Sequence, residues 1–407
     1  MKGRAARVTL CTSCLAAALF VSSCAPSERY LLRQREEVFS GNRYVRVLVK
    51  KARDEVVVSS GDKIKLTDMK DRSFKYFEGG RRISFRAGSV RSPLELESWN
   101  SPLSVDGVPY RGTIELHNVT GTLFVINSVK LEEYLFGVVP SEMPSLWPLE
   151  AIKSQAVAAR TYAYYHITKH KNLLYDLDAT TKSQVYGGMA AEVESTNRAV
   201  TETSGEIIAH RQGPILSYFH STCGGRTIDD RYVWTQNDLP YLGAVTCPYC
   251  ADSPKLNWEY RLRTAELRGA LRKEHPGIRS IKQISFKRLQ GRVASVVVRH
   301  NEGLARLTGN QFRMMISPMK IKSLAFEVKK EKGALLLKGK GWGHGVGLCQ
   351  YGARGMAERG MSHRDILKHY YRDVDIIKID GSRDREPSGD RQVARRTTKR
   401  GHPEHDE

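Results

Sequence analysis

The 407-residue sequence lacks an apolar run long enough for a transmembrane helix, and it is short of acidic residues. The mostly apolar stretch 8–21 has 14 residues, whereas a helix needs roughly 20 to cross the hydrocarbon core of a bilayer. Only 44 Asp and Glu stand against 65 Lys and Arg, which gives a formal net charge of +21. This imbalance indicates an anionic partner, such as a nucleic acid, a membrane surface or an acidic polymer, without choosing among them.

The sequence also lacks the phosphate-binding signature Gly-x-x-x-x-Gly-Lys-Ser/Thr and any repeat at a fixed period. Its 40% hydrophobic and 27% charged residues are ordinary for a folded chain, which excludes the disordered and collagen-like classes. The length predicts two or three structural units, and we expect two.

The first residues have the layout of a secretory signal. A positive start (Lys2, Arg4, Arg7) precedes the apolar stretch, and small residues then lead to Cys24. Residues 1–24 therefore predict export, which makes nucleic acid an unlikely partner. The ending resembles a bacterial lipobox, in which Cys24 becomes lipid-modified and the protein is held at a membrane in the cell envelope; the alternative is an ordinary signal cleaved near Ser23 or Ala25.

The positive charge belongs to the body of the chain. Residues 381–407 contain seven Lys and Arg, six Asp and Glu and almost no apolar residues, so we expect a disordered tail. Subtracting the tail's single net charge and the three charges of residues 1–24 from +21 leaves +17 on residues 25–380. An anionic partner is thus expected to meet a folded surface.

The order of patterns predicts an α+β fold, with a β-rich N-terminal part and a mixed body that form two lobes around a cleft. Residues 42–130 contain short β-branched runs bounded by Gly, Asp and Asn, which predicts strands at 44–49, 55–58, 63–66, 113–116 and 123–126. In the body, 131–375, apolar spacing predicts helices and strands. Helices are expected at 148–168, 190–203, 264–274, 306–315 and 362–371, and strands at 215–219, 281–286 and 293–299.

Glu142 is the candidate general acid. It lies between Pro140 and Pro144, in what we interpret as a stiff and mostly apolar turn. Burial disfavours the charged form of a carboxylate, so such a site can raise its pKa towards the range that proton donation needs near neutral pH. The alternatives are a solvated turn glutamate or a charge at a helix N-terminus.

Two cations follow on the predicted helix 148–168. Lys153 and Arg160 are seven residues apart and therefore share a helix face. Such a face could form an anion-binding wall beside Glu142; the alternative is a solvated face or a structural salt bridge.

A His-x-x-Cys motif and a Cys-x-x-Cys motif predict a zinc site. His220 and Cys223 are followed, after 23 intervening residues, by Cys247 and Cys250. Four such donors suit a closed tetrahedral zinc site, which leaves no position for water and is therefore structural. The alternatives are disulfide bonds, or a catalytic Cys223 with His220 as its base. Cys349 is interpreted as a small buried hydrophobe.

Residues 339–353 contain glycine at almost every second position, which implies unusual turns or a close approach of the backbone to something else. The segment also carries Trp342, His344, Gln350 and Tyr351, which offer the stacking faces and hydrogen bonds that a sugar-binding groove needs. The alternative is a structural loop in which His344 binds a backbone carbonyl.

Four motifs, in this order, resemble the stage II sporulation protein D family (SpoIID/LytB) of bacterial cell-wall proteins. The likeness covers about residues 42–375, and the motifs that carry it lie at 139–144 (Val-Pro-Ser-Glu-Met-Pro), 156–163, 219–225 and 341–347. Together they are specific for the family.

The resemblance implies a lytic transglycosylase that cuts peptidoglycan glycan strands, preferring strands whose peptides an amidase has removed. The family's catalytic glutamate matches Glu142, which would form a 1,6-anhydro-muramic acid end without a second carboxylate. The resemblance also implies cell-wall remodelling or division as the setting, and it agrees with a structural zinc.

The resemblance supports a set of substrate-binding residues around the cleft, namely Lys153, Gln155, Arg160, His344, Gln350 and Tyr351. Some relatives are amidase enhancers, so the alternative function is a non-catalytic, peptidoglycan-binding enhancer of an N-acetylmuramoyl-L-alanine amidase. In either case the expected partners are peptidoglycan strands and a cell-wall amidase.

Overall fold

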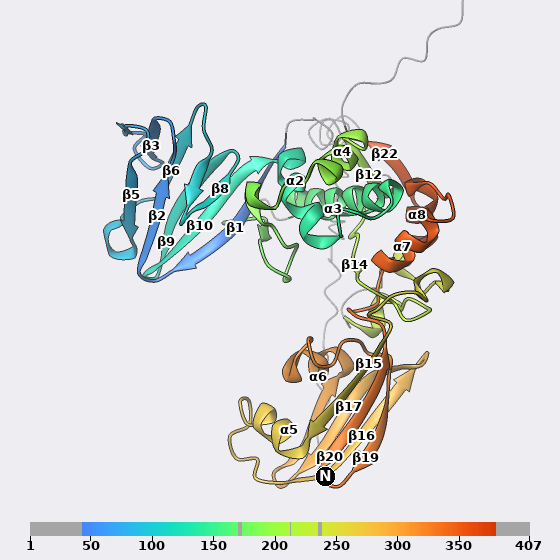
Figure 1. The fold of residues 1–407 in the computed structure, drawn as a ribbon. Coiled ribbons are helices and arrows are strands. Elements are labelled where there is room, and N and C mark those ends of the chain that lie inside the picture. The colour runs from blue at the N-terminus through green and yellow to red at the C-terminus, as the bar shows by residue number, and fades with distance from the viewer. Residues whose placement is uncertain (1–42, 170–172, 212, 235–237, 380–407) are drawn as a thin grey trace, which may run out of the picture. The chain divides into compact units, whose positions relative to one another are not determined.

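The computed structural model describes residues 43–169, 173–211, 213–234 and 238–379. The chain divides into two compact units, Met1–Phe39 and Ser40–Glu407, and all of the described residues belong to the second. The predicted signal segment 1–24, with Cys24, and the predicted tail 381–407 lie outside the described residues. Helices and strands in several separate sheets confirm the α+β class (Figure 1). Within the described ranges, no helix combines the length and apolar character that crossing a membrane requires.

Residues 44–130 fold into two antiparallel sheets, as their β-branched runs predict. One sheet has seven strands in the order β11-β1-β10-β9-β6-β3-β4. Its strand β11 comes from later in the chain and is the one that pairs in parallel. The other sheet has four strands in the order β5-β2-β7-β8. The five strands expected from sequence are confirmed as β1, β2, β3, β9 and β10. The bounds are β1 Tyr44–Ala52, β2 Glu55–Ser59, β3 Ile64–Asp68, β4 Phe74–Phe77, β5 Arg82–Arg86, β6 Leu94–Ser98, β7 Leu103–Val105, β8 Val108–Tyr110, β9 Thr113–Val119, β10 Thr122–Lys130 and β11 Leu177–Asp178.

The core of this region follows the two-residue period of its strands. Val45 and Val47 of β1 and Leu123 and Val125 of β10 are fully buried, because alternate side chains of a strand point to the same face. The intervening residues on β1 are less buried, for example Arg46, which forms an ion pair with Asp176.

The central helices are α2, α3, α4, α7 and α8, and α3 contacts each of the other four (Figure 1). Their bounds are α2 Leu131–Glu142, α3 Leu149–Lys169, α4 Glu194–Glu202, α7 Gln350–Ala357 and α8 His363–Tyr370. Short strands accompany them, at β12 Glu206–His210, β13 Gly213–Pro214, β14 Phe219–His220, β21 Leu348–Cys349 and β22 Asp375–Lys378.

Helix α3 confirms the predicted helix but is not amphipathic. Residues 156–164 are all buried, including the polar Arg160 and Thr161. Small alanines at 156, 158, 159 and 163 allow neighbouring elements to approach from all sides, so this stretch is a core helix.

Residues 257–340 form a second β-rich module with its own hydrophobic core, which the sequence did not separate from the body. Two three-stranded sheets, β15-β20-β19 and β16-β17-β18, enclose a cluster that includes Trp258, Val296, Phe312 and Leu337. The bounds are β15 Asn257–Arg263, α5 Thr264–Leu271, β16 Ile281–Leu289, β17 Arg292–His300, β18 Gly303–Thr308, α6 Gly309–Ile316, β19 Phe326–Glu331 and β20 Ala334–Lys340.

Four local expectations need correction. The predicted strand 215–219 is wrong: residues 215–218 belong to no strand, the Leu216 N–H donates to Tyr241 Oη, and only Phe219 lies in a strand, β14. The predicted helix 306–315 begins at Gly309, where Thr308 and Gln311 form a capping box. The predicted helix 190–203 is the shorter α4, Glu194–Glu202, and a separate short 3-10 helix, Gly188–Ala191, precedes it. The predicted turn at Glu142 is the end of helix α2.

Candidate active site

Glu142 is the last residue of α2, and the helix is held in place by its buried face. Tyr134, Leu135 and Val138 have no exposed surface. Pro140 lies in the last turn, and the helix closes with the Met143 N–H donating to the carbonyl of Val139 at 3.0 Å. The terminus of a packed helix therefore fixes the position of the carboxylate.

The Glu142 carboxylate is partly buried and has a single described hydrogen bond. Its Oε1 accepts from the backbone N–H of Val185 at 2.8 Å. Burial raises the pKa of Glu142, and the Val185 N–H opposes this only in part, while no charged side chain among the described residues contributes. Burial raises the pKa values of Tyr134 and Tyr162, that of Tyr162 to about 12, and the nearby Glu142 charge adds to both shifts, so both remain neutral hydroxyls.

The segment 183–188 supplies the Val185 N–H, and it packs directly on α2. The Gly187 N–H donates to the carbonyl of Gly137 at 3.2 Å. A Cβ on Gly137 would lie 2.6 Å from Tyr186 Cε2, so only glycine permits this approach. Tyr186 Oη in turn donates to Asn127 Oδ1 at 2.9 Å. The sequence marked Gly187-Gly188 only as a break, and nothing in it pointed to Val185.

Gln155 and Gln350 are brought to Glu142, as predicted for residues of one site. Gln350 Nε2 donates to the main-chain carbonyl of Glu142 at 3.0 Å and lies 3.3 Å from Gln155 Oε1. The Nε2 of Gln155 is buried and has no hydrogen-bond partner among the described residues. Buried donors are rarely left unpaired, so this amide is an exception in the interior next to Glu142, and Gln155 itself has no exposed surface.

Tyr351 lies beside the segment that follows Glu142. Its ring meets that of Trp147 edge to face, with centroids 4.7 Å apart. The Arg354 guanidinium also contacts Trp147, at 5.6 Å from the ring centroid. Both rings are partly exposed. Together they add an aromatic surface next to the carboxylate site.

Arg160 is not part of an anion-binding wall. Its side chain is fully buried, with Nε and Nη2 each 2.8 Å from an oxygen of Glu132, and it also donates to the carbonyls of Val200 and Glu206. The structural alternative therefore holds for Arg160. Lys153 is likewise engaged, with its Nζ 2.9 Å from Glu150 and 2.7 Å from Glu202.

His344 binds backbone groups. Its Nε2 lies 2.9 Å from the carbonyl of Phe219, and its Nδ1 accepts from the Val346 N–H at 3.1 Å. Burial, with help from Arg313, lowers its pKa to about 4, so the ring is neutral at pH 7. None of its described contacts is with Glu142; its ring instead neighbours those of Tyr218 and Trp234.

The structure groups a different fourth residue with three of the predicted metal ligands. The sulfurs of Cys223, Cys247, Cys250 and Cys349 lie within 4.8 Å of one another. His220 is not in this set of four sulfurs. Its Nδ1 lies 3.0 Å from the carbonyl of Val346, and its buried Nε2 has no hydrogen-bond partner among the described residues. Strands β14 and β21 pair in parallel, which places Cys349 opposite His220 and therefore close to the other three cysteines. Because more than 120 residues separate Cys349 from His220 in the sequence, the spacing of motifs did not predict this contact.

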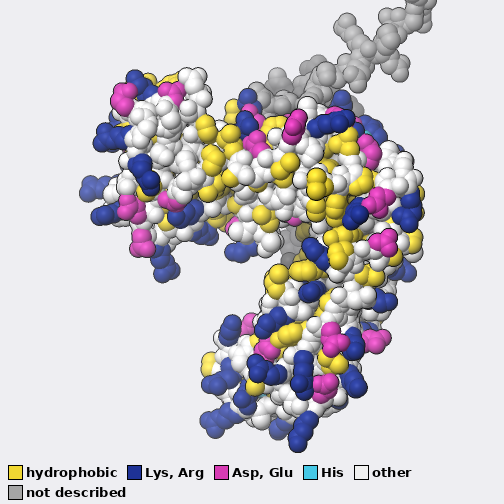
Figure 2. All heavy atoms as spheres, in the orientation of Figure 1, with side chains coloured by type: hydrophobic (Ala, Val, Ile, Leu, Met, Phe, Trp, Pro, Cys, Tyr) yellow, Lys and Arg dark blue, Asp and Glu magenta, His cyan; other side chains and the backbone are white. Residues whose placement is uncertain are grey.

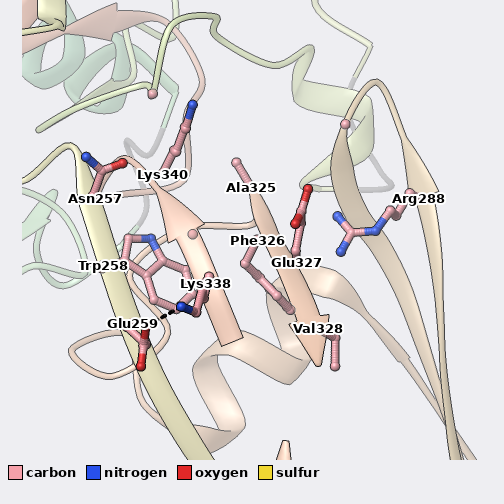
Figure 3. A pocket seen from close by; sticks show the side chains of 13 residues that line it. Asn257, Trp258, Glu259, Arg288, Ala325, Phe326, Glu327, Val328, Lys338 and Lys340 are labelled. Atoms are coloured by element: carbon pink, nitrogen blue, oxygen red, sulfur yellow. Dashed lines mark ion pairs between the residues drawn. The ribbon is translucent and has the colours of Figure 1, made fainter. Parts of the chain in front are cut away.

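A separate hollow of about 1110 Å³ lies in the 257–340 module (Figure 3). Charged side chains of both signs line it, including Arg288, Glu327 and the ion pair between Glu259 and Lys338 at 3.1 Å. The sequence did not predict it, and no residue of the Glu142 site belongs to its lining.

Comparison with known proteins identifies the family. The family model of stage II sporulation protein matches residues 119–210, and that of a domain of unknown function (DUF8618) matches residues 250–347. Stage II sporulation protein D of Bacillus amyloliquefaciens is 34% identical over 272 residues, which covers 63% of this chain and 76% of the relative. The chain belongs to the stage II sporulation protein D family.

Two further relatives widen this picture. An uncharacterized protein of Brachyspira hyodysenteriae is 40% identical over 277 residues, covering 67% of this chain and 74% of the relative. The amidase enhancer of Bacillus subtilis is 31% identical over 372 residues, covering 78% of this chain but only 51% of the relative. Family membership and these relatives support a function related to the cell wall.

The stage II sporulation protein match contains Glu142, Gln155 and the Val185 segment. It contains none of the four clustered cysteines, nor Gln350 and Tyr351. In this member of the family, α7 supplies the last two, directly after Cys349. The site around Glu142 is thus assembled from segments about 200 residues apart.

Proposed function

We propose that this protein is a peptidoglycan lytic transglycosylase with Glu142 as its single catalytic acid and base. The observation that carries the proposal is the environment of this carboxylate: it lies at a helix end, burial raises its pKa, one backbone N–H holds it, and no cation neutralises it among the described residues. A carboxyl group of this kind can hold a proton nearer to neutral pH than an ordinary glutamate.

The reaction needs one proton carrier and no water. Protonated Glu142 donates its proton to the glycosidic oxygen between N-acetylmuramic acid and the next N-acetylglucosamine, and the C1–O bond breaks. The 6-hydroxyl oxygen of the same muramic acid then bonds to C1, while the Glu142 carboxylate accepts its proton. The products are a 1,6-anhydro-muramic acid end and a free 4-hydroxyl, and Glu142 is again protonated.

Neighbouring groups support this role. The Val185 N–H bonds to Oε1, which orients the carboxyl group and leaves Oε2 without a described hydrogen bond, so that Oε2 can face the sugar. The partly exposed Trp147–Tyr351 aromatic pair offers a stacking surface to the same substrate.

Cations other than Arg160 would bind the carboxylates of a denuded strand. Lys255 and Lys322 place their Nζ atoms 5.0 and 4.6 Å from the ring centroid of Trp342, in the glycine-rich loop, and among the described residues neither pairs with a carboxylate. Removal of the stem peptides exposes one lactyl carboxylate per disaccharide, which makes the strand a polyanion that suits these lysines.

We propose that the four cysteines hold a structural zinc ion. Four sulfurs within 4.8 Å fit a closed tetrahedral set, and the N–H groups of Cys223 and Gly352 lie 3.2 and 3.3 Å from Cys349 Sγ, as donors to a thiolate would. The buried Arg292 donates to the carbonyl of Cys223 and has no carboxylate partner in the described ranges, so zinc thiolates would supply its countercharge. A bound zinc would tie the segment after β14, the 247–250 segment and β21 together and take no part in the reaction.

The zinc proposal is tested by metal content and melting temperature. Cys349→Ser should lower the bound zinc and the melting temperature, whereas His220→Ala should retain the metal. Chelation should destabilise the wild type before it slows turnover. Equal zinc loss in both variants, or cysteines found in disulfides, would contradict the set.

The remaining parts of the proposal concern location and partners. The signal segment and Cys24 suit an exported lipoprotein of the cell envelope, where peptidoglycan lies. The amidase enhancer among the relatives favours a second candidate function, in which the protein binds peptidoglycan and stimulates an amidase without cleaving glycan.

Mass analysis of the products from purified denuded glycan separates the two functions. Wild type should release fragments with 1,6-anhydro ends, and Glu142→Gln should reduce their formation by about 10²–10⁴-fold, because the amide keeps the shape and cannot carry the proton. Glu133→Gln, on the same helix, is the matched control and should retain activity. Reducing ends alone, or equal cleavage by Glu142→Gln, would refute the transglycosylase; unchanged amidase stimulation by Glu142→Gln, with no cleavage by the wild type, would establish the enhancer.

A further inference from the structure

Three exposed aromatic side chains form a continuous strip on the N-terminal sheet. Phe74 is 59% exposed, Tyr76 49% and Trp99 58%. The ring centroids of Phe74 and Tyr76 are 5.5 Å apart, and those of Tyr76 and Trp99 are 6.0 Å apart. Scattered exposed aromatics are normal on a protein surface, but contiguous ones usually mark a binding site. We call these three residues the aromatic strip.

The strip lies at an open edge of the seven-stranded sheet. Phe74 and Tyr76 are two residues apart on β4, the last strand of the sheet, so their side chains share a face. Trp99 directly follows β6, the strand on the other side of β3. The strip thus runs from β4 across β3 to the end of β6, and about half of each side chain is exposed. The Phe74 and Tyr76 rings are inclined to each other by 69°, and the Tyr76 and Trp99 rings by 38°.

Lysine and glutamate side chains lie next to the rings of the aromatic strip. Lys65 Nζ is 5.5 Å from the Phe74 ring centroid and 2.7 Å from Glu97 Oε1. Lys63 Nζ is 5.9 Å from the Tyr76 ring centroid and 3.7 Å from Glu78 Oε1. The strip is therefore bordered by both hydrogen-bond donors and acceptors. Surface ion pairs of this kind are weak, so these side chains can break them and hydrogen-bond to a ligand instead at little energetic cost.

We propose that the aromatic strip binds a glycan strand at a site separate from the Glu142 centre; this rests on the proposed function for the choice of glycan. The faces of aromatic rings carry partial negative charge, and the C–H groups on one face of a pyranose carry partial positive charge, so the two stack. The hydroxyl and acetamido groups around the sugar both donate and accept hydrogen bonds, as do the ion pairs that border the strip.

The same features fit other partners less well. The core of a protein–protein contact is depleted of charged residues, whereas Lys63, Lys65 and Glu97 are interleaved with these rings. The wider region suits an acidic polymer, since residues 43–130 carry 16 Lys and Arg against ten Asp and Glu, and Figure 2 shows basic side chains projecting from the region of β2, β3 and β5.

The position of the strip defines its role. Phe74, Tyr76 and Trp99 precede residue 119, where the family match begins, and none of their described contacts involves the Glu142 site. A second binding site of this kind would hold a long strand while the catalytic site acts on it. It would matter for long strands and not for short ones, because a short oligosaccharide fills the catalytic site alone.

The test measures glycan binding by calorimetry in the full chain carrying Glu142→Gln, so that the ligand is not cleaved. Phe74→Ala and Trp99→Ala, added singly, should each weaken binding of long denuded strands about tenfold and leave binding of a tetrasaccharide unchanged. Tyr44→Ala removes an aromatic side chain of similar exposure, 50%, outside the strip and should bind like the parent. Circular dichroism and melting temperatures check that each variant is folded.

The outcomes separate this proposal from the proposed function. Unchanged long-strand binding in both strip variants would overturn it, whatever products the wild type forms. So would normal strand binding combined with lost stimulation of an amidase, which would make the strip a protein-docking surface. If strip variants lose strand binding while the wild type forms no 1,6-anhydro ends, the strip assignment holds and the transglycosylase proposal fails.

Discussion

Glu132 and Glu142 lie near the two ends of the same helix, α2, and have opposite surroundings. Glu132, in the first turn, forms a two-pronged ion pair with Arg160, with both N–O distances 2.8 Å, and accepts from the Gly205 N–H at 3.2 Å. Glu142, the last residue, has the Val185 N–H and no described cation. Of these two glutamates, the fold gives only Glu132 a charged partner among the described residues.

The helix itself enlarges the difference. Its N-terminus stabilises a negative charge in the first turn, and its C-terminus disfavours one in the last turn. Glu132 is therefore suited to a permanent charge that anchors Arg160, whereas Glu142 is suited to gaining and losing a proton. A candidate acid is thus recognised by the lack of a counter-ion as much as by burial.

The largest effect is expected from removing the cation of the structural pair. Arg160→Met leaves the bonds to Glu132, Val200 and Glu206 unmade, and loss of a buried ion-pair partner costs about 3–5 kcal/mol. The free energy of unfolding in urea should fall by about this amount, while the KM of the protein that remains folded stays the same.

Lys153→Met is the matched control, since it removes another cation of α3, whose partners Glu150 and Glu202 are about one-third exposed. It should destabilise by about 1 kcal/mol or less. A raised KM with normal stability in Arg160→Met would support the anion-binding interpretation. It would also mean that the ion pair of Glu132 with Arg160 does not stabilise the fold.

The pH dependence of turnover sharpens the other side of the comparison. Burial raises the pKa of Glu142, and the protonated form donates the proton, so kcat/KM for glycan cleavage should fall tenfold per pH unit once the pH exceeds this raised pKa. His344 is neutral over the same range, because its pKa is lowered to about 4.

The profile is measured with denuded glycan, with melting curves at each pH to exclude unfolding. Glu133→Gln should reproduce the falling limb of the wild type. If kcat/KM instead rises with pH throughout, Glu142 does not act as the acid, and its difference from Glu132 has no catalytic meaning.

The sequence predicted Glu142 for partly different reasons from those the structure gives. The flanking prolines indicated a stiff apolar site, and burial does raise the pKa. They did not indicate a helix end, since Pro140 is tolerated in the last turn of α2. Val185 could not be predicted at all, because a backbone N–H leaves no signature in a side-chain pattern.

Arg160 and Cys349 show where local patterns stop being informative. Spacing placed Arg160 on a helix face, but whether that face meets solvent depends on α2 and α4, which pack against it from other parts of the chain. Cys349 lacked a partner nearby in sequence and gains three through the pairing of β14 with β21. By contrast, strands β1 to β3 were predicted correctly, because their signal is a local alternation of apolar and polar side chains along the strand.

The smallest effect is expected at a third glutamate, Glu150 of α3, which has the cations that Glu142 lacks. Lys153 and His363 hold its pKa at about 2, which stabilises the fold above the ordinary pKa of a glutamate and ceases to do so as the pH falls through about 2. Glu150→Gln should therefore lower the free energy of unfolding at pH 7 by about 1 kcal/mol, with a difference from the wild type that shrinks below pH 4.5.

Urea unfolding at pH 7 and pH 3 measures this difference in the free energy of unfolding. Glu358→Gln is the control and should have a smaller effect, because Glu358 forms an exposed pair with Arg354. A difference that stays constant with pH would mean that Glu150 contributes packing rather than charge, and that the contrast with Glu142 lies in burial alone.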